Sequence, residues 1–93
     1  MDYLYIIKAS GQLVATVSLR DIIVAEPEIK LKEIMKANVI YLKDDDKIQS
    51  LNEIMTKYSL LSIPVVNAEK EMVGVVIIND VAHNLFKNRR KRN

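Results

Sequence analysis

One pattern occurs twice in this chain. The second copy starts 59 positions after the first, and the two align without insertions or deletions. Each copy contains an apolar run, a short polar turn, a second apolar run and then an Asp at the start of a predicted helix. The copies are Tyr3–Asp21 and Ser62–Asp80. A repeat at a fixed period indicates two copies of one supersecondary unit. We therefore expect the chain to fold as two related units.

The size and composition fit one small folded domain. The 93 residues are 49% hydrophobic and 28% charged, which is typical of globular rather than disordered chains. There is no cysteine, so neither a disulfide framework nor a thiolate metal site is expected. No apolar stretch approaches the roughly 20 residues that span a bilayer, and no signal peptide is visible. These features predict a cytoplasmic location.

The net charge of +2 hides a basic C-terminal tail at residues 87–93. Five Lys and Arg side chains lie in this tail, and the rest of the chain has nine basic and twelve acidic residues. Such a tail can contact nucleic acid or an anionic membrane surface. No aromatic residue lies among these charges, so the stacking contacts of single-strand binding are missing. We interpret the tail as a solvated terminus and expect no nucleic-acid partner, with nucleic-acid contact kept as an alternative.

The residue pattern predicts an α/β fold. The expected strands, which are rich in β-branched and aromatic residues, are Tyr3–Ile7, Gln12–Val17, Val39–Leu42, Ser62–Val66 and Met72–Ile77. The expected helices cover residues 18–25, 47–58 and 79–86, and a short linker helix lies within 29–37. The second unit (38–86) is then β-α-β-β-α. The first unit (1–28) has only β-β-α.

Two of the predicted helix starts carry polar residues three positions apart. Ser18 is followed by Asp21, and Asp46 is followed by Gln49. Both pairs resemble a capping box, in which side chains accept hydrogen bonds from free backbone N–H groups at the start of a helix. Both pairs therefore predict N-caps.

The two units resemble a tandem pair of cystathionine-β-synthase (CBS) motifs, the Bateman module. The segments that carry the resemblance are Ser62–Asn67, Met72–Asp80 and Leu13–Asp21. Within this superfamily, Ser18–Pro27 followed by Lys32–Met35 is similar to the MgtE-type magnesium transporters and to their soluble relatives. The resemblance implies tandem β-α-β-β-α motifs, with the opening strand and helix of the first motif missing. It also implies a non-catalytic regulatory role, with a magnesium transporter or another attached domain as the controlled partner.

The resemblance further implies an adenine nucleotide in the cleft between the paired motifs. The family pattern is Gly, two apolar residues, Ser or Thr, two residues and Asp. In the first copy Ser18 and Asp21 match its polar positions, while Ala15 replaces the glycine. Ser18 and Asp21 are suited to phosphate and ribose hydroxyls, and Arg20 adds a cation for phosphate oxygens. The alternative is that Ser18 and Asp21 only cap a helix.

The second copy departs from the family pattern. Ile77 occupies the Ser/Thr position, although Gly74 and Asp80 are kept. One competent site is therefore expected, and its nucleotide is ATP, ADP or AMP. The residues expected to bind it are Tyr3, Ser18, Arg20, Asp21, Val39, Ile40, Tyr41 and Leu60.

The likeness to MgtE implies a magnesium site as well. Mg²⁺ prefers oxygen ligands, and two or three carboxylates have to converge on it. The expected ligands are Asp44, Asp45, Asp46 and Asp80. Three adjacent aspartates also fit a solvated loop that ends in an N-cap, so both interpretations stay open.

No enzyme chemistry is expected. His83 is the only histidine and has no cysteine, second histidine or serine nucleophile near it in the sequence. We expect a homodimer, because CBS pairs expose apolar helix faces and the first unit lacks the strand and helix that should cover it. A ligand-free dimerisation module, for which Ile77 is the best evidence, is the alternative function.

Overall fold

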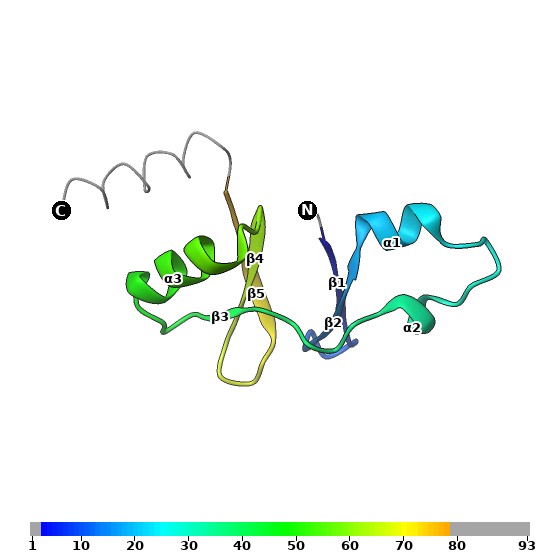
Figure 1. Ribbon diagram of the computed structural model, residues 1–93. Coiled ribbons are helices and arrows are strands. Elements are labelled where there is room, and N and C mark those ends of the chain that lie inside the picture. The colour runs from blue at the N-terminus through cyan, green and yellow to red at the C-terminus, as the bar shows by residue number, and fades with distance from the viewer. Residues whose placement is uncertain (1–2, 79–93) are drawn as a thin grey trace.

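The computed structural model describes residues 3–78 (Figure 1). The predicted last helix at 79–86, with Asp80 and His83, lies outside the described residues, as does the basic tail. Within residues 3–78, no helix is long and apolar enough to cross a bilayer.

The first unit is a β-hairpin followed by a short helix. It consists of β1 (Tyr3–Ile7), β2 (Leu13–Ser18) and α1 (Leu19–Val24). In this antiparallel pair Leu4 lies opposite Val17 and Tyr5 opposite Thr16. The turn contains Gly11 with a φ of 91°, a left-handed conformation that glycine adopts without steric cost.

The linker extends the sheet of the first unit. After α2 (Leu31–Ile34), which confirms the predicted linker helix, the backbone of Lys36 pairs with Thr16 of β2. The Thr16 N–H donates to the Lys36 carbonyl at 2.9 Å, and the Lys36 N–H donates to the Thr16 carbonyl at 2.8 Å. Lys36 therefore continues this sheet beyond β2 by a single bridge.

The second unit has a three-stranded sheet with a helix against one face. Its elements are β3 (Leu42–Lys43), α3 (Ile48–Tyr58), β4 (Ser62–Val66) and β5 (Met72–Ile77). The strand order is β3-β4-β5, with β3 parallel to β4 and β5 antiparallel to β4. Leu42, Met55, Ile63 and Ile78 form the buried core between the helix and the sheet. Figure 1 shows α3 at one end of the molecule, α1 and α2 at the other, and the strands between them.

The predicted α/β architecture is confirmed, but two local predictions are wrong. Only Leu42 and Lys43 pair in a strand, whereas residues 39–41 have no ladder partners. Asp46 is not a helix cap, because Lys47 holds the N-cap position of α3 and makes no side-chain capping bond there. The Asp46 carboxylate instead accepts from the Lys43 N–H at 2.8 Å, and Gln49 pairs with Glu53. The acidic run thus closes a turn between β3 and α3.

The two units are joined through their hairpins. The Leu13 N–H donates to the Lys70 carbonyl at 3.0 Å, and the Met72 N–H donates to the Gly11 carbonyl at 2.9 Å. On the faces between the two sheets, the Tyr5 Oη and Ser62 Oγ atoms are hydrogen-bonded. Backbone and side-chain hydrogen bonds thus both connect the two hairpins.

Candidate functional site

Residues at matching repeat positions occupy the faces that the two hairpins turn toward each other. Side chains of directly opposed residues in an antiparallel pair lie on the same face of a sheet. Tyr3, Tyr5, Thr16 and Ser18 therefore share one face of the β1–β2 hairpin. The residues 59 positions later share one face of the β4–β5 hairpin, and they are Ser62, Pro64, Val75 and Ile77.

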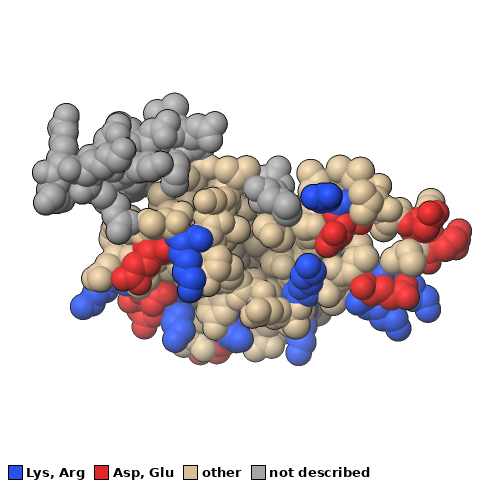
Figure 2. Space-filling view, viewed as in Figure 1, with Lys and Arg blue, Asp and Glu red and all other residues tan. Residues whose placement is uncertain are grey.

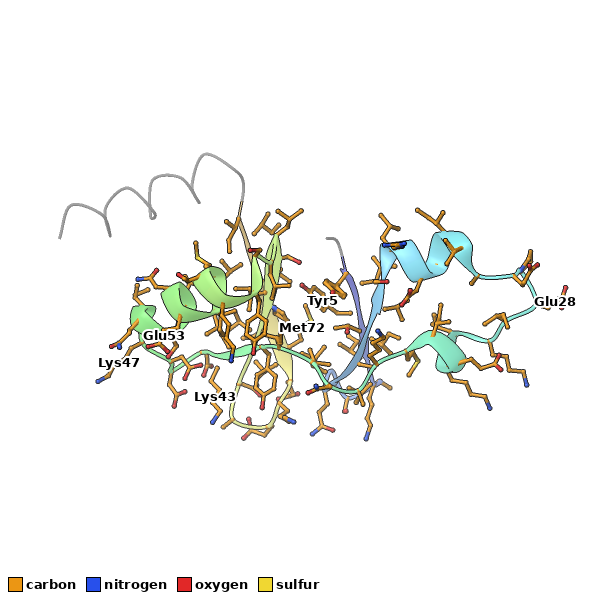
Figure 3. All side chains as sticks on the ribbon, in the orientation of Figure 1. Tyr5, Glu28, Lys43, Lys47, Glu53 and Met72 are labelled. Carbon is orange, nitrogen blue, oxygen red and sulfur yellow. The ribbon has the colours of Figure 1, made fainter. Side chains whose placement is uncertain are left out.

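A cavity of about 120 Å³ lies between these two faces. Both units and the linker contribute its walls, which are formed by Tyr3, Tyr5, Thr16, Lys36, Asn38, Ile40, Leu60, Ser62 and Pro64. Small-molecule sites usually occupy roughly 300–1,000 Å³. This cavity is smaller, so it has room for a single ring system and leaves the rest of a nucleotide-sized ligand outside. Tyr5 projects from β1 toward the second unit (Figure 3).

The lining of the cavity is mixed. Figure 2 shows most Lys, Arg, Asp and Glu side chains toward the two ends and the lower edge of the molecule, with a few close to the middle and on the upper part of this face. Five of the nine lining residues are aromatic or aliphatic, and four are polar, with Lys36 as the charged one. That composition is typical of pockets for flat organic ligands.

Val39, Ile40 and Tyr41, which we expected to bind the nucleotide together, do not line the same pocket. Ile40 lines the cavity together with Tyr3 and Leu60. Val39 and Tyr41 instead line a groove of about 470 Å³. The segment 39–41 therefore contributes to two different pockets. The Tyr41 ring lies 5.2 Å from the Lys70 Nζ atom in a cation–π contact.

Ser18, Arg20 and Asp21 do not line the cavity, although Ser18 is the strand neighbour of the wall residue Tyr3. Ser18 is opposite Tyr3 in the register of the hairpin, and its Oγ accepts from the Asp21 N–H at 3.0 Å. The predicted N-cap of α1 is thereby confirmed. This bond uses one lone pair of a hydroxyl that has a donor and a second lone pair as well. Arg20 is exposed, Asp21 is partly buried, and neither residue is in the wall of the cavity.

Several lining residues were missed by the sequence analysis. The family resemblance placed Tyr3 at the site, strand alternation puts Tyr5 on the same face as Tyr3, and the repeat relates these two to Ser62 and Pro64. That signal was available in the sequence. Lys36 and Asn38 had no comparable signal, because their positions depend on how the linker pairs with β2.

The acidic run lies away from this cavity. Asp44 and Asp45 line a groove of about 420 Å³ that also contains Lys43 and Lys70. Within residues 3–78, no three His, Asp or Glu side chains are grouped so that they could hold a metal ion. The magnesium site expected at Asp44, Asp45, Asp46 and Asp80 remains a prediction, since Asp80 is outside the described residues.

Comparison with known proteins shows the family. The CBS domain family matches residues 31–87, and this chain belongs to it. The chain is 37% identical over 79 residues to the magnesium transporter MgtE of Thermus thermophilus and 39% identical over 84 residues to MgtE of Bacillus subtilis. These matches cover 85% and 87% of the chain and 18% of each transporter. The chain thus spans less than a fifth of these relatives.

Enzymes are also among the similar proteins. The homoserine O-acetyltransferase of Methanosarcina acetivorans is 31% identical over 84 residues, which cover 88% of this chain and 16% of that protein. A shared CBS region therefore occurs in proteins with different activities.

Two solved structures resemble the chain closely enough to compare ligands. The cytosolic domain of the Mg²⁺ channel MgtE in complex with ATP is 37% identical with a TM-score of 0.77, covering 85% of this chain and 32% of that one. A CBS domain pair in complex with methylthioadenosine and S-adenosylmethionine is 25% identical with a TM-score of 0.67, covering 100% of this chain and 73% of that one. The predicted CBS fold and the predicted likeness to MgtE are confirmed.

Proposed function

We propose that this chain is a non-catalytic, cytoplasmic regulatory module that binds an adenine nucleotide between its two CBS units. The observation that carries the proposal is the cavity of about 120 Å³, whose walls bring Tyr3 of one unit and Leu60 of the other around a ring-sized space. The adenine base occupies this space, and ATP, ADP and AMP are the candidate ligands. The ATP complex of the MgtE cytosolic domain supports this assignment.

The ribose and phosphates lie outside the cavity, because it has room only for the base. Ser18 borders the wall residue Tyr3, and Arg20 and Asp21 follow in the first turn of α1. A carboxylate accepts hydrogen bonds from ribose hydroxyls, and a guanidinium forms charge-assisted bonds with phosphate oxygens. These three residues are therefore proposed to bind the polar part of the nucleotide.

A ligand in this cavity contacts both units, so its binding shifts the equilibrium between different arrangements of the two units. The cavity walls come from β1, β2, the linker and β4. A ligand shifts a conformational equilibrium only by the difference in its affinity for the two states. A nucleotide that contacts both units favours the arrangement in which both walls reach it. We propose that this shift controls an attached domain, such as a magnesium transporter.

Isothermal titration calorimetry with ATP, ADP and AMP tests the proposal. At least one nucleotide is expected to bind with one site per chain. Leu60→Ala removes a wall of the cavity and is expected to weaken binding about tenfold, which corresponds to about 1.4 kcal/mol. Leu61→Ala is the matched control, because Leu61 is 41% exposed and is not a wall residue. Heats equal to buffer for all three nucleotides would contradict the proposal.

A second candidate function is supported by the surface of α1. No residue of this helix is buried, and Ile23 and Val24 are 73% and 71% exposed. Contiguous exposed apolar side chains often mark a protein–protein interface. We propose that this surface forms a homodimer, either as part of the nucleotide-dependent module or as a ligand-free dimerisation module. Self-association unchanged by any nucleotide would favour the ligand-free function.

A further inference from the structure

The cavity between the two units has a single ionisable wall residue apart from its two tyrosines. Of the nine described residues that line it, only Lys36 is basic and none is acidic. Lys36 was not among the residues that the family pattern picks out, and its place at the cavity comes from the pairing of the linker with β2.

The backbone fixes the direction of the Lys36 side chain. Lys36 and Thr16 exchange both backbone hydrogen bonds, at 2.9 and 2.8 Å, so they form an antiparallel pair whose side chains lie on the same face. Thr16 is in turn opposite Tyr5 across the hairpin. Tyr5, Thr16 and Lys36 thus form one row across the sheet, and all three line the cavity.

The side chain of Lys36 lies at the rim of the cavity. It contributes to the wall and is also exposed to solvent. With the base in this cavity of about 120 Å³, as proposed above, the ribose and phosphates extend beyond it, and Lys36 is the basic wall residue nearest to them. The Lys36 ammonium group therefore interacts electrostatically with this part of the ligand.

We infer that Lys36, in addition to Arg20, makes this site select phosphorylated adenosine compounds over uncharged or cationic ones. The inference rests on the proposed nucleotide function. An ammonium group forms charge-assisted hydrogen bonds with phosphate oxygens, gains nothing comparable from an uncharged nucleoside and is repelled by a sulfonium. Similar CBS structures hold ATP in one case and methylthioadenosine with S-adenosylmethionine in another. Both ligand classes thus occur with this fold, so the fold alone does not fix which class binds.

Calorimetry with adenosine, AMP, ATP and S-adenosylmethionine on wild type and Lys36→Gln measures this selectivity. Glutamine keeps the backbone pairing with Thr16 and removes the charge, so the fold is retained. ATP affinity is expected to fall about tenfold in Lys36→Gln, while adenosine affinity changes less than about twofold. Lys32→Gln is the matched control, since Lys32 is an exposed lysine of the neighbouring helix α2 that is not part of the cavity wall.

The outcomes separate the inference from the function on which it rests. If wild type binds adenosine and ATP but their affinity ratio is the same in Lys36→Gln, the inference is wrong and the nucleotide function stands. Tighter binding of S-adenosylmethionine than of ATP to wild type also overturns the inference alone. If wild type binds none of the four compounds, the nucleotide function itself is wrong.

Discussion

The two units of this chain share a hairpin but differ in what covers it. In the second unit, α3 packs on the sheet and a core forms from Leu42, Met55, Ile63 and Ile78. In the first unit the buried hydrophobic side chains are Leu13, Ala15 and Val17, all from β2, and α1 buries no residue. The comparison teaches that the repeated hairpin does not make a core by itself. In the second unit, Leu42 of the preceding strand and Met55 of the preceding helix complete the core with Ile63 and Ile78.

The difference has a consequence for the site. The first unit contributes Tyr3 and Tyr5 to the cavity wall, while the second unit contributes Leu60, which packs against the buried core. The site therefore lies between a well-buried unit and a thinly covered one. Three predictions test this contrast.

The largest effect is expected in the core of the second unit. Ile63 is fully buried, so Ile63→Ala is expected to lower the free energy of unfolding by about 2–5 kcal/mol, through lost burial and the cavity that remains. Ile77→Ala on the adjacent strand β5 is the control, because Ile77 is 80% exposed and an exposed position changes stability by less than about 0.5 kcal/mol. Urea unfolding measures both. Equal losses would mean that the core is not where we place it.

A smaller effect is expected on self-association through the first unit. Ile23→Glu puts a charge on the exposed apolar surface of α1 and is expected to weaken the proposed homodimer at least tenfold, about 1.4 kcal/mol. Ile48→Glu, on α3 of the second unit, changes an isoleucine that is 69% exposed and should leave the dimer intact. Light scattering over a concentration series gives the mass. A monomeric wild type, or equal weakening by both variants, would contradict an interface on α1.

The smallest effect concerns the starts of the helices in the two units. Ser18→Ala removes the N-cap bond of α1 and is expected to cost about 1 kcal/mol. Lys47 holds the same position in α3 without a side-chain capping bond, so Lys47→Ser is expected to stabilise the protein by about 0.5–1 kcal/mol. Thermal unfolding followed by circular dichroism compares them. Shifts of the same sign in the two variants would argue against this account of the caps.

Much of the fold could be predicted from local patterns. Alternating apolar residues between turn residues predicted the bounds of β1, β4 and β5. The repeat predicted that the two hairpins are copies of one unit. The prediction was wrong at residues 39–41, where β-branched and aromatic residues have no ladder partner, because strand propensity depends on the packing context. It was wrong at Asp46 because the carboxylate bonds to the Lys43 N–H within the preceding turn.

The site could be predicted only in part. The family resemblance predicted that Tyr3, Ile40 and Leu60 bind the nucleotide, and these residues do line the cavity. Lys36 and Asn38 were not found, since a linker residue reaches the site through a long-range backbone pairing that has no local signal. Long-range pairing depends on the whole fold, whereas a capping pattern such as Ser18 with Asp21 depends on neighbouring residues alone.

The most direct test of the central claim is amide chemical-shift mapping of the labelled protein during an ATP titration. The account predicts that the largest shifts occur at Tyr3, Thr16, Ile40 and Ser62, which lie in two units and the linker and share one cavity. Residues on the exposed side of α3, such as Gln49 and Glu53, should not move. Saturable shifts confined to one unit, or no shifts at millimolar ATP, would contradict a nucleotide site between the units.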